Sequence, residues 1–259
     1  TYFCCIKKLC SIMMKLFIHI GQYISLMKKV FTKPDKSKIF WQQVIKEIDY
    51  LGLDSLGIVA VISVFMGTVV AIQTAYNIDS PWIPKYTVGF ITRQSIILEF
   101  SPTIISLILA GKVGSRIASE IGTMKVTEQI DALEIMGINS ANYLILPKIT
   151  AAMLINPVLI TISMFLGLLG GWFASLISNE ITPEIYIYGI QSFYKGFEVF
   201  YALIKTVVFA FIITSVSGYT GYFTKGGALE VGWSSTKGVV YSSILIIIFN
   251  LILTQLLLA

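Results

Sequence analysis

The sequence predicts an all-α integral membrane protein. Its residues are 56% hydrophobic and only 13% charged, well below the charged fraction of about one-quarter that is usual in soluble domains. Five apolar segments each come close to the ~20 residues that an α-helix needs to cross a bilayer. A lysine-rich stretch precedes them, and one charged block separates the second from the third. We therefore expect an N-terminal amphipathic helix at the membrane interface, five transmembrane helices and a cytoplasmic helix between spans two and three.

Residues 1–40 are predicted to form the interfacial helix and a short polar linker. Apolar residues recur at helical spacing over residues 5–31, with lysines on the flanks and the opposite face. A basic amphipathic helix of this kind lies on an anionic membrane leaflet, so the basicity gives no support to a nucleic-acid partner. The apolar stripe consists of Leu9, Met13, Leu16, Ile20, Tyr23, Met27 and Val30.

Residues 41–259 are predicted to form one membrane domain. If the N-terminus is cytoplasmic, fifteen of the nineteen lysines and arginines fall on the cytoplasmic side. The positive-inside rule then predicts a multi-pass protein with its N-terminus inside and its C-terminus outside. The five spans are expected at about residues 51–76, 91–117, 149–177, 200–223 and 239–259.

The charged block EIGTMKVTEQIDALEIMGI, residues 120–138, is predicted to contain a helix over residues 124–137. Three apolar residues share one face of this helix, and three carboxylates lie on the adjacent arc. It is either a solvated charged face over an apolar contact, or a docking helix whose apolar stripe rests on the membrane body while its acidic arc meets a cytoplasmic partner. Composition alone does not choose between the two. The apolar residues are Val126, Ile130 and Leu133, and the carboxylates are Glu128, Asp131 and Glu134.

Charged residues inside the spans mark a second candidate site. Glu99 lies ~13 Å into its span at 1.5 Å per residue. A lone charge at such depth costs on the order of 2.5–3.5 kcal/mol, so Glu99 is expected to face a cavity, find a partner or be protonated. Lys205 enters the fourth span from the same side and is the expected partner, with snorkelling to the interface as the alternative. Arg93, nearer the outer mouth, is expected to be an interfacial anchor.

Residues 99–149, EFSPTIISLILAGKVGSRIASEIGTMKVTEQIDALEIMGINSANYLILPKI, closely resemble the MlaE/YrbE family of permeases. The family elements E-[LF]-[GS]-P, A-G-[RK]-x-G and E-[IL]-G-x-M-x-x-T-E-Q-[IL] stand here in order. The resemblance covers about residues 41–258, and such an ordered set is far more specific than one short motif. It also takes in FMGTVVAIQ (65–73), FAFIITSVSGYTGY (209–222) and GALEVGWSSTKGVVYSS (227–243).

This resemblance implies the permease subunit of an ABC-type transporter in the bacterial inner (plasma) membrane. Family members move phospholipid or related lipid between that membrane and an extracytoplasmic MCE-domain lipid-binding protein, a role tied to outer membrane lipid asymmetry. The resemblance further implies a homodimer and a separate P-loop ATPase, and this chain has no G-x-x-x-x-G-K-[ST] motif of its own. Catalytic residues, metals and other cofactors are not expected.

The resemblance also assigns residues to two sites, one that couples to the ATPase and one inside the membrane. Two departures from the family pattern, Leu98 in place of a basic residue and Asn250 in place of an aspartate, predict a thinner polar network. The coupling residues are Glu120, Lys125, Glu128, Gln129, Asp131, Glu134 and Gly137, and the substrate-pocket and polar residues are Glu99, Lys205, Asn250, Val69, Gln73 and Tyr76.

Small residues at helical spacing predict close helix contacts. These contacts are expected within one subunit, with a dimer seam as the alternative. The residues are Ala110, Gly114 and Ala118 in the second span, and Gly167 and Gly171 in the third.

Two other functions stay open at this stage. A proton-coupled secondary transporter using Glu99 would work without an ATPase and would show an inverted repeat, which the five unequal spans do not suggest. A membrane scaffold that recruits a cytoplasmic partner would tolerate apolar replacements of Glu99 and Lys205.

Overall fold

The computed structural model describes residues 17–32, 37–78, 82–178 and 182–258. Within these ranges all regular elements are helical, and five continuous helices are long and apolar enough to cross a membrane. The prediction of an all-α integral membrane protein is thereby confirmed. Each helix begins earlier than the sequence predicted, because its first turns are amphipathic rather than uniformly apolar. The helices comprise Ser37–Asn77, Thr87–Val126, Ser140–Ile177, Gly196–Tyr222 and Ala228–Leu257.

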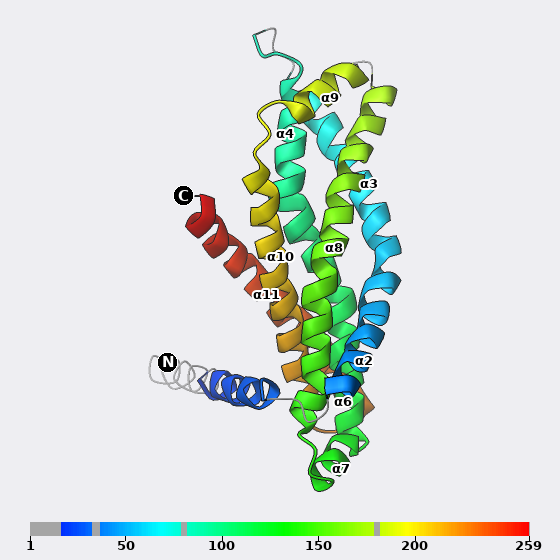
Figure 1. The fold of residues 1–259 in the computed structure, drawn as a ribbon, viewed down its shortest axis with the longest axis vertical. Helices are drawn as coiled ribbons and strands as arrows, with labels where there is room; N and C mark the ends of the chain where they lie inside the picture. Colours follow the sequence, from blue (N-terminus) through cyan, green and yellow to red (C-terminus); the bar gives the residue numbers. More distant parts are fainter. Residues whose placement is uncertain (1–16, 33–36, 79–81, 179–181, 259) are drawn as a thin grey trace, which may run out of the picture.

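The long helices run together along the longest axis of the molecule (Figure 1). The short helix α7 (Gln129–Ile135) lies at one end of this bundle and α9 (Pro183–Gln191) at the other. We call these the α7 end and the α9 end. Helix α11 (Ala228–Leu258) packs near its start against α6 and α10, then diverges from the bundle, so only 11% of its apolar window is buried.

The first membrane helix has an amphipathic beginning that the sequence analysis did not predict. Helix α2 (Ser37–Ile48) continues through a π-helical turn, η1 (Asp49–Leu53), into α3 (Asp54–Asn77). Val44 of α2 is fully buried, whereas Trp41 is 54% exposed. The predicted linker was to end at residue 40, which lies inside this helix. The helix was not predicted because α8, on which α2 packs, is distant in the sequence.

The second membrane helix is continuous from Thr87 to Val126 but includes two π-helical segments. The first of these contains Pro102, which has no N–H to donate, so the helix widens there instead of breaking. In chain order the segments are α4 (Thr87–Ser95), η2 (Ile96–Ile104), α5 (Ile105–Leu109), η3 (Ala110–Gly114) and α6 (Ser115–Val126).

The predicted helix over residues 124–137 is wrong, because the chain breaks at Thr127 and Glu128. Glu128 has a φ of 60°, in the left-handed region that ends helices. Its N–H donates to the carbonyl of Lys125 and its own carbonyl accepts from Ala132, so the turn closes α6 and opens α7. Ile130, just after the break, is fully buried. The break therefore turns α7 back onto the membrane body.

The third and fourth membrane helices, α8 (Ser140–Ile177) and α10 (Gly196–Tyr222), form the centre of the bundle. Close approach of α3 and α8 depends on glycine: a Cβ at Gly67 would overlap the backbone of Gly167, and one at Gly170 would overlap Val64. Gly114 likewise faces Ser217 of α10. The small residues therefore serve contacts within one subunit, as predicted.

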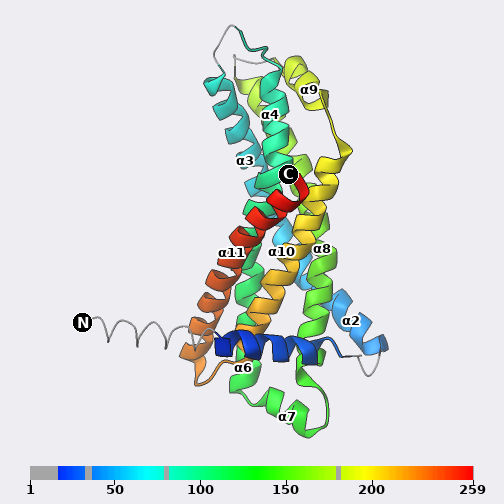
Figure 2. The ribbon, with the colours of Figure 1, turned by 90° about the vertical axis from the view of Figure 1, so that its left-hand side faces the viewer.

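The N-terminal helix, residues 17–30, lies across the foot of the bundle near the α7 end (Figure 2). Met27 and Val30 are buried as the predicted stripe requires, whereas Ile20 is 46% exposed. Asn142 of α8 donates to the carbonyl of Val30 at 2.7 Å and fixes the end of the helix. The predicted stripe residues Leu9, Met13 and Leu16 lie outside the described residues.

Replacement of Gly67 by leucine is expected to destabilise the protein by about 1–3 kcal/mol, because the added side chain meets backbone that cannot move aside. The measurement is the unfolding free energy in detergent. A Cβ added at Gly57 of the same helix would meet no atom within 4 Å, so Gly57→Leu is the matched control and should change stability by less than about 0.5 kcal/mol. Equal effects of the two changes would refute the close-packing account.

Candidate functional site

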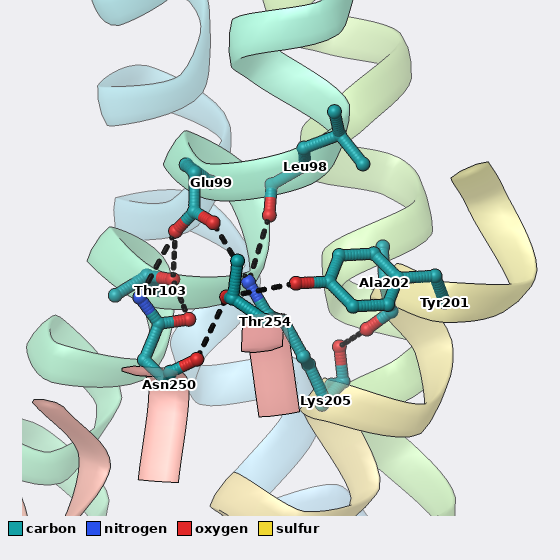
Figure 3. A network of polar contacts seen from close by, with 9 residues as sticks. Leu98, Glu99, Thr103, Tyr201, Ala202, Lys205, Asn250 and Thr254 are labelled. Atoms are coloured by element: carbon teal, nitrogen blue, oxygen red, sulfur yellow. Dashed lines mark hydrogen bonds and ion pairs between the residues drawn. The ribbon is translucent and has the colours of Figure 1, made fainter. Parts of the chain in front are cut away.

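An ion pair inside the membrane helices is the centre of the first candidate site. Lys205 of α10 donates to Glu99 Oε1 of η2 at 2.8 Å and to the carbonyl of Leu98 at 3.2 Å (Figure 3). The Lys205 side chain is fully buried, whereas the Glu99 side chain is 43% exposed at the surface of the single chain. The predicted pairing is confirmed, and snorkelling of Lys205 is excluded by its burial.

The third member of this network comes from α11. Asn250 Nδ2 donates to Glu99 Oε2 at 3.0 Å. The hydroxyl of Thr103 lies 3.2 Å from both Glu99 Oε2 and Asn250 Oδ1 and donates to either. The site thus joins the second, fourth and fifth membrane helices and carries one positive and one negative charge. Such a neutral, hydrogen-bonded group is far less costly in a membrane than either charge alone.

The polar network is more extensive than the sequence analysis predicted. Tyr201 places its ring 4.6 Å from the Lys205 ammonium, and its hydroxyl lies 2.9 Å from the hydroxyl of Thr254. Together with Thr103, these residues were missed. Each lies four positions from a predicted member on the same helix, so helical spacing from Glu99, Lys205 and Asn250 was the available signal.

The predicted pocket residues Val69, Gln73 and Tyr76 share one face of α3. All three are exposed in the single chain, Val69 by 55% and Tyr76 by 81%. Any enclosure of this face therefore requires a second surface.

Arg93 is not the interfacial anchor that the sequence predicted. Its side chain is 1% exposed and donates to the carbonyls of Ile190 at 2.6 Å and Ser192 at 2.8 Å. Glu198 Oε2 lies 3.7 Å from Arg93 Nη2, and its negative charge balances that of the guanidinium. Arg93 therefore satisfies carbonyl groups at the C-terminal end of α9, a helix that the sequence analysis did not anticipate.

The predicted coupling residues surround α7, but most of their charges are engaged within the chain. Glu120 pairs with Lys148 at 2.8 Å, and Lys125 pairs with Asp131 at 2.5 Å. Gly137 ends α7 with a φ of 78°.

Glu134 also turns toward the membrane body instead of joining an acidic arc. It accepts hydrogen bonds from Tyr222 at 2.8 Å and from Ser140 at 2.9 Å. These two bonds hold the pKa of the Glu134 carboxyl below its usual value, so it stays ionised. Glu128 and Gln129 are left exposed at the break.

The exposed part of this turn includes two large apolar side chains, which the sequence analysis missed. Ile135 is 88% exposed and Met136 is 65% exposed, directly beside Gly137. Exposed aliphatic side chains on a short ordered turn are typical of a protein contact. The sequence could have indicated this exposure, because the two residues lie off the face of α7 that carries Ile130. That face packs against the membrane helices.

The fold and these two groups of residues describe a multi-pass membrane bundle with a polar site among its helices and an exposed turn at one end, residues 127–137, which we call the contact turn. The family described as Permease MlaE matches residues 44–256, and the chain belongs to this family.

Named relatives agree with this assignment. A probable ABC transporter permease protein of Rickettsia bellii is 34% identical over 237 residues, which cover 92% of this chain and 91% of the relative. A probable ABC transporter permease protein of Synechocystis is 34% identical over 228 residues, 88% of this chain and 86% of the relative. Protein TRIGALACTOSYLDIACYLGLYCEROL 1 of Arabidopsis thaliana chloroplasts is 32% identical over 220 residues, 85% of this chain and 63% of that protein. The chain is an ABC transporter permease of the MlaE family.

The ion pair predicts an asymmetric response to mutation. Glu99→Gln should lower the unfolding free energy by about 3–5 kcal/mol, since it leaves a wholly buried ammonium without its counter-charge. Lys205→Met should have a smaller effect, because an unpaired carboxyl group can take up a proton and become neutral, and Asn250 and Thr103 remain as its hydrogen-bond partners. The double variant should be closer to wild type than Glu99→Gln alone. Denaturation in detergent of all four proteins measures this cycle, and purely additive effects would show that the two residues do not interact.

Proposed function

We propose that two copies of this chain form the membrane part of a lipid transporter in a bacterial inner membrane. A separate P-loop ATPase seats on residues 120–138, and phospholipid or a related lipid passes between the membrane and an extracytoplasmic MCE-domain protein. The observation that carries the proposal is the exposed apolar pair Ile135 and Met136 at the tip of α7.

The contact turn is attached to the membrane helices firmly enough to transmit force to them. Its base is fixed by buried Ile130, by the Lys125–Asp131 ion pair and by the hydrogen bonds to Glu134. Its tip is open to a partner. A partner that moves the tip therefore moves α6 and α8, the two membrane helices that flank the turn, instead of merely bending a loop.

The distribution of charge supports a cytoplasmic location for the α7 end. Positively charged residues concentrate on the cytoplasmic side of membrane proteins. Three basic residues belong to the α9 end or its connections, Lys85, Arg93 and Lys195. The α7 end, including the foot of the bundle, carries Lys28, Lys29, Lys46, Lys112, Arg116, Lys125 and Lys148.

A lipid cargo accounts for the surfaces that the single chain leaves uncovered. The exposed face of α3 is mainly apolar, and α11 buries only 11% of its apolar window. A second copy set against these surfaces encloses a wall that suits acyl chains better than ions. The name of the Arabidopsis relative includes that of a diacylglycerol lipid, which favours a lipid cargo.

Native mass spectrometry of the tagged chain, extracted gently from a host that carries the neighbouring genes, tests this assembly. We expect a dimer that retains lipid together with two ATPase subunits and an MCE-type protein. A lipid-free species without an ATPase in several mild detergents would contradict the proposal.

Ile135→Asp is expected to weaken binding of the ATPase by about tenfold or more, since it places a charge in a desolvated apolar contact. Titration of the ATPase onto the permease in nanodiscs measures this. The control is Ile187→Asp, an exposed isoleucine of α9 at the opposite end, which should leave ATPase affinity unchanged. An unchanged affinity for the Ile135 variant would place the ATPase elsewhere.

A further inference from the structure

We propose that Lys148 is the positioning residue that transmits movement of the ATPase contact turn to the first membrane helix. This inference rests on the proposed function and goes beyond it, because it identifies how the first span, which does not adjoin the turn in sequence, follows the ATPase.

Lys148 connects three helices through two ion pairs. Its ammonium lies 2.6 Å from Glu47 Oε1 of α2 and 2.8 Å from Glu120 Oε2 of α6, while Lys148 itself belongs to α8. Its side chain is only 4% exposed, whereas those of Glu47 and Glu120 are 19% and 48% exposed. The lysine ammonium is therefore buried, and the two carboxylates that pair with it lie nearer the surface.

Two of the three residues lie beside a hydrogen-bonding defect in their helix, and the third lies within α6. Glu47 lies just before the π-helical turn η1 that joins α2 to α3. Lys148 directly follows Pro147, where α8 lacks a backbone donor. Glu120 is in α6, whose end at Val126 precedes the break before α7. Hydrogen-bonding defects of this kind are where helices bend. Lys148 thus connects α6 to the places where α2 and α8 are able to bend.

The packing of α2 leaves few other routes. Among the described residues, α2 packs chiefly on α8 and continues into η1, without extensive contact with α6 or α7. Movement of α6 therefore reaches α2 itself through Glu120, Lys148 and Glu47. Arg116 of α6 also pairs with Asp54 at the start of α3 at 2.9 Å, but both side chains are exposed. Exposed pairs are weak, so the buried Lys148 is the firmer link. From α2 it continues into α3, which carries the exposed face with Val69 and Tyr76.

Stability alone does not call for this arrangement. Buried ion pairs are often no more stabilising than apolar residues of similar size. A cavity of about 370 Å³ also lies beside the three side chains, and it is lined by the further cations Lys46 and Arg116. The carboxylates therefore have room and alternative partners when the helices shift, as a moving connection requires.

The test uses the full transporter, permease with its ATPase, in lipid vesicles, and measures both ATP hydrolysis and transfer of a fluorescent phospholipid. Glu47→Gln keeps the shape of the side chain but removes its charge. We expect the lipid transferred per ATP to fall about tenfold while ATPase binding and turnover stay within about twofold of wild type. The control is Lys38→Gln, an exposed residue of the same helix that does not line this cavity, which should change neither quantity.

A second variant, Glu120→Gln, tests the other ion pair and should also lower the lipid transferred per ATP. Because Glu120 lies at the edge of the proposed ATPase seat, this variant is measured at saturating ATPase. Full coupling in either Gln variant would overturn the role of Lys148, and so would a failure of both to fold, because the triad would then be purely structural. If the wild-type permease binds no ATPase, the proposed function fails and this inference fails with it. If it binds one and both Gln variants transport normally, only this inference fails.

Discussion

The ion pair between Glu99 and Lys205 is the constraint on which the arrangement of the membrane helices depends. A fully buried ammonium must have a counter-charge close by, and this fixes α10 against η2 at one depth. Asn250 then brings in α11 through its amide. The π-helical geometry of η2 accommodates Pro102 in the same segment that carries Glu99. The π-helical geometry around Pro102, the pairing of the two charges and the placement of α10 and α11 therefore depend on one another.

The identity of residue 250 matters for this balance. An aspartate there would add a second negative charge beside Glu99, with Lys205 as the cation of the network. The asparagine donates a hydrogen bond instead, so the network is neutral with both charges ionised. The expectation of a network thinner than the family pattern counted charged side chains alone. The hydroxyl of Thr103 and the amide of Asn250, which carry no charge, complete the hydrogen bonding of the pair.

Depth and helical spacing were sufficient to predict the pairing of Glu99 with Lys205 and the burial of Ile130. They did not predict the break at Glu128, because glutamate has no preference for left-handed backbone and tertiary packing imposes the turn. Arg93 was misplaced for a similar reason. Its burial depends on carbonyl groups of α9, which lie nearly a hundred residues away in the chain. Amphipathic α2 was missed because its partner α8 is likewise remote.

These features combine into a division between fixed and movable parts. Glycine contacts fix α3 to α8 along the membrane, and the ion pair fixes the second, fourth and fifth membrane helices together. At the α7 end, a turn with an apolar tip is attached to two of the same helices, and Lys148 ties that region to the first span. Under the proposed function, a push on the tip would therefore reach helices that these contacts hold together.

The central claim is that this permease moves lipid with energy from a separate ATPase. The most direct measurement is transfer of labelled phospholipid from vesicles that contain the permease and its ATPase to an acceptor lipid-binding protein, with either ATP or a proton gradient supplied. Our account predicts transfer that requires ATP and the ATPase and is indifferent to the proton gradient. Transfer driven by the proton gradient in the absence of the ATPase would contradict it and would make Glu99 the proton-linked carboxylate of a secondary transporter.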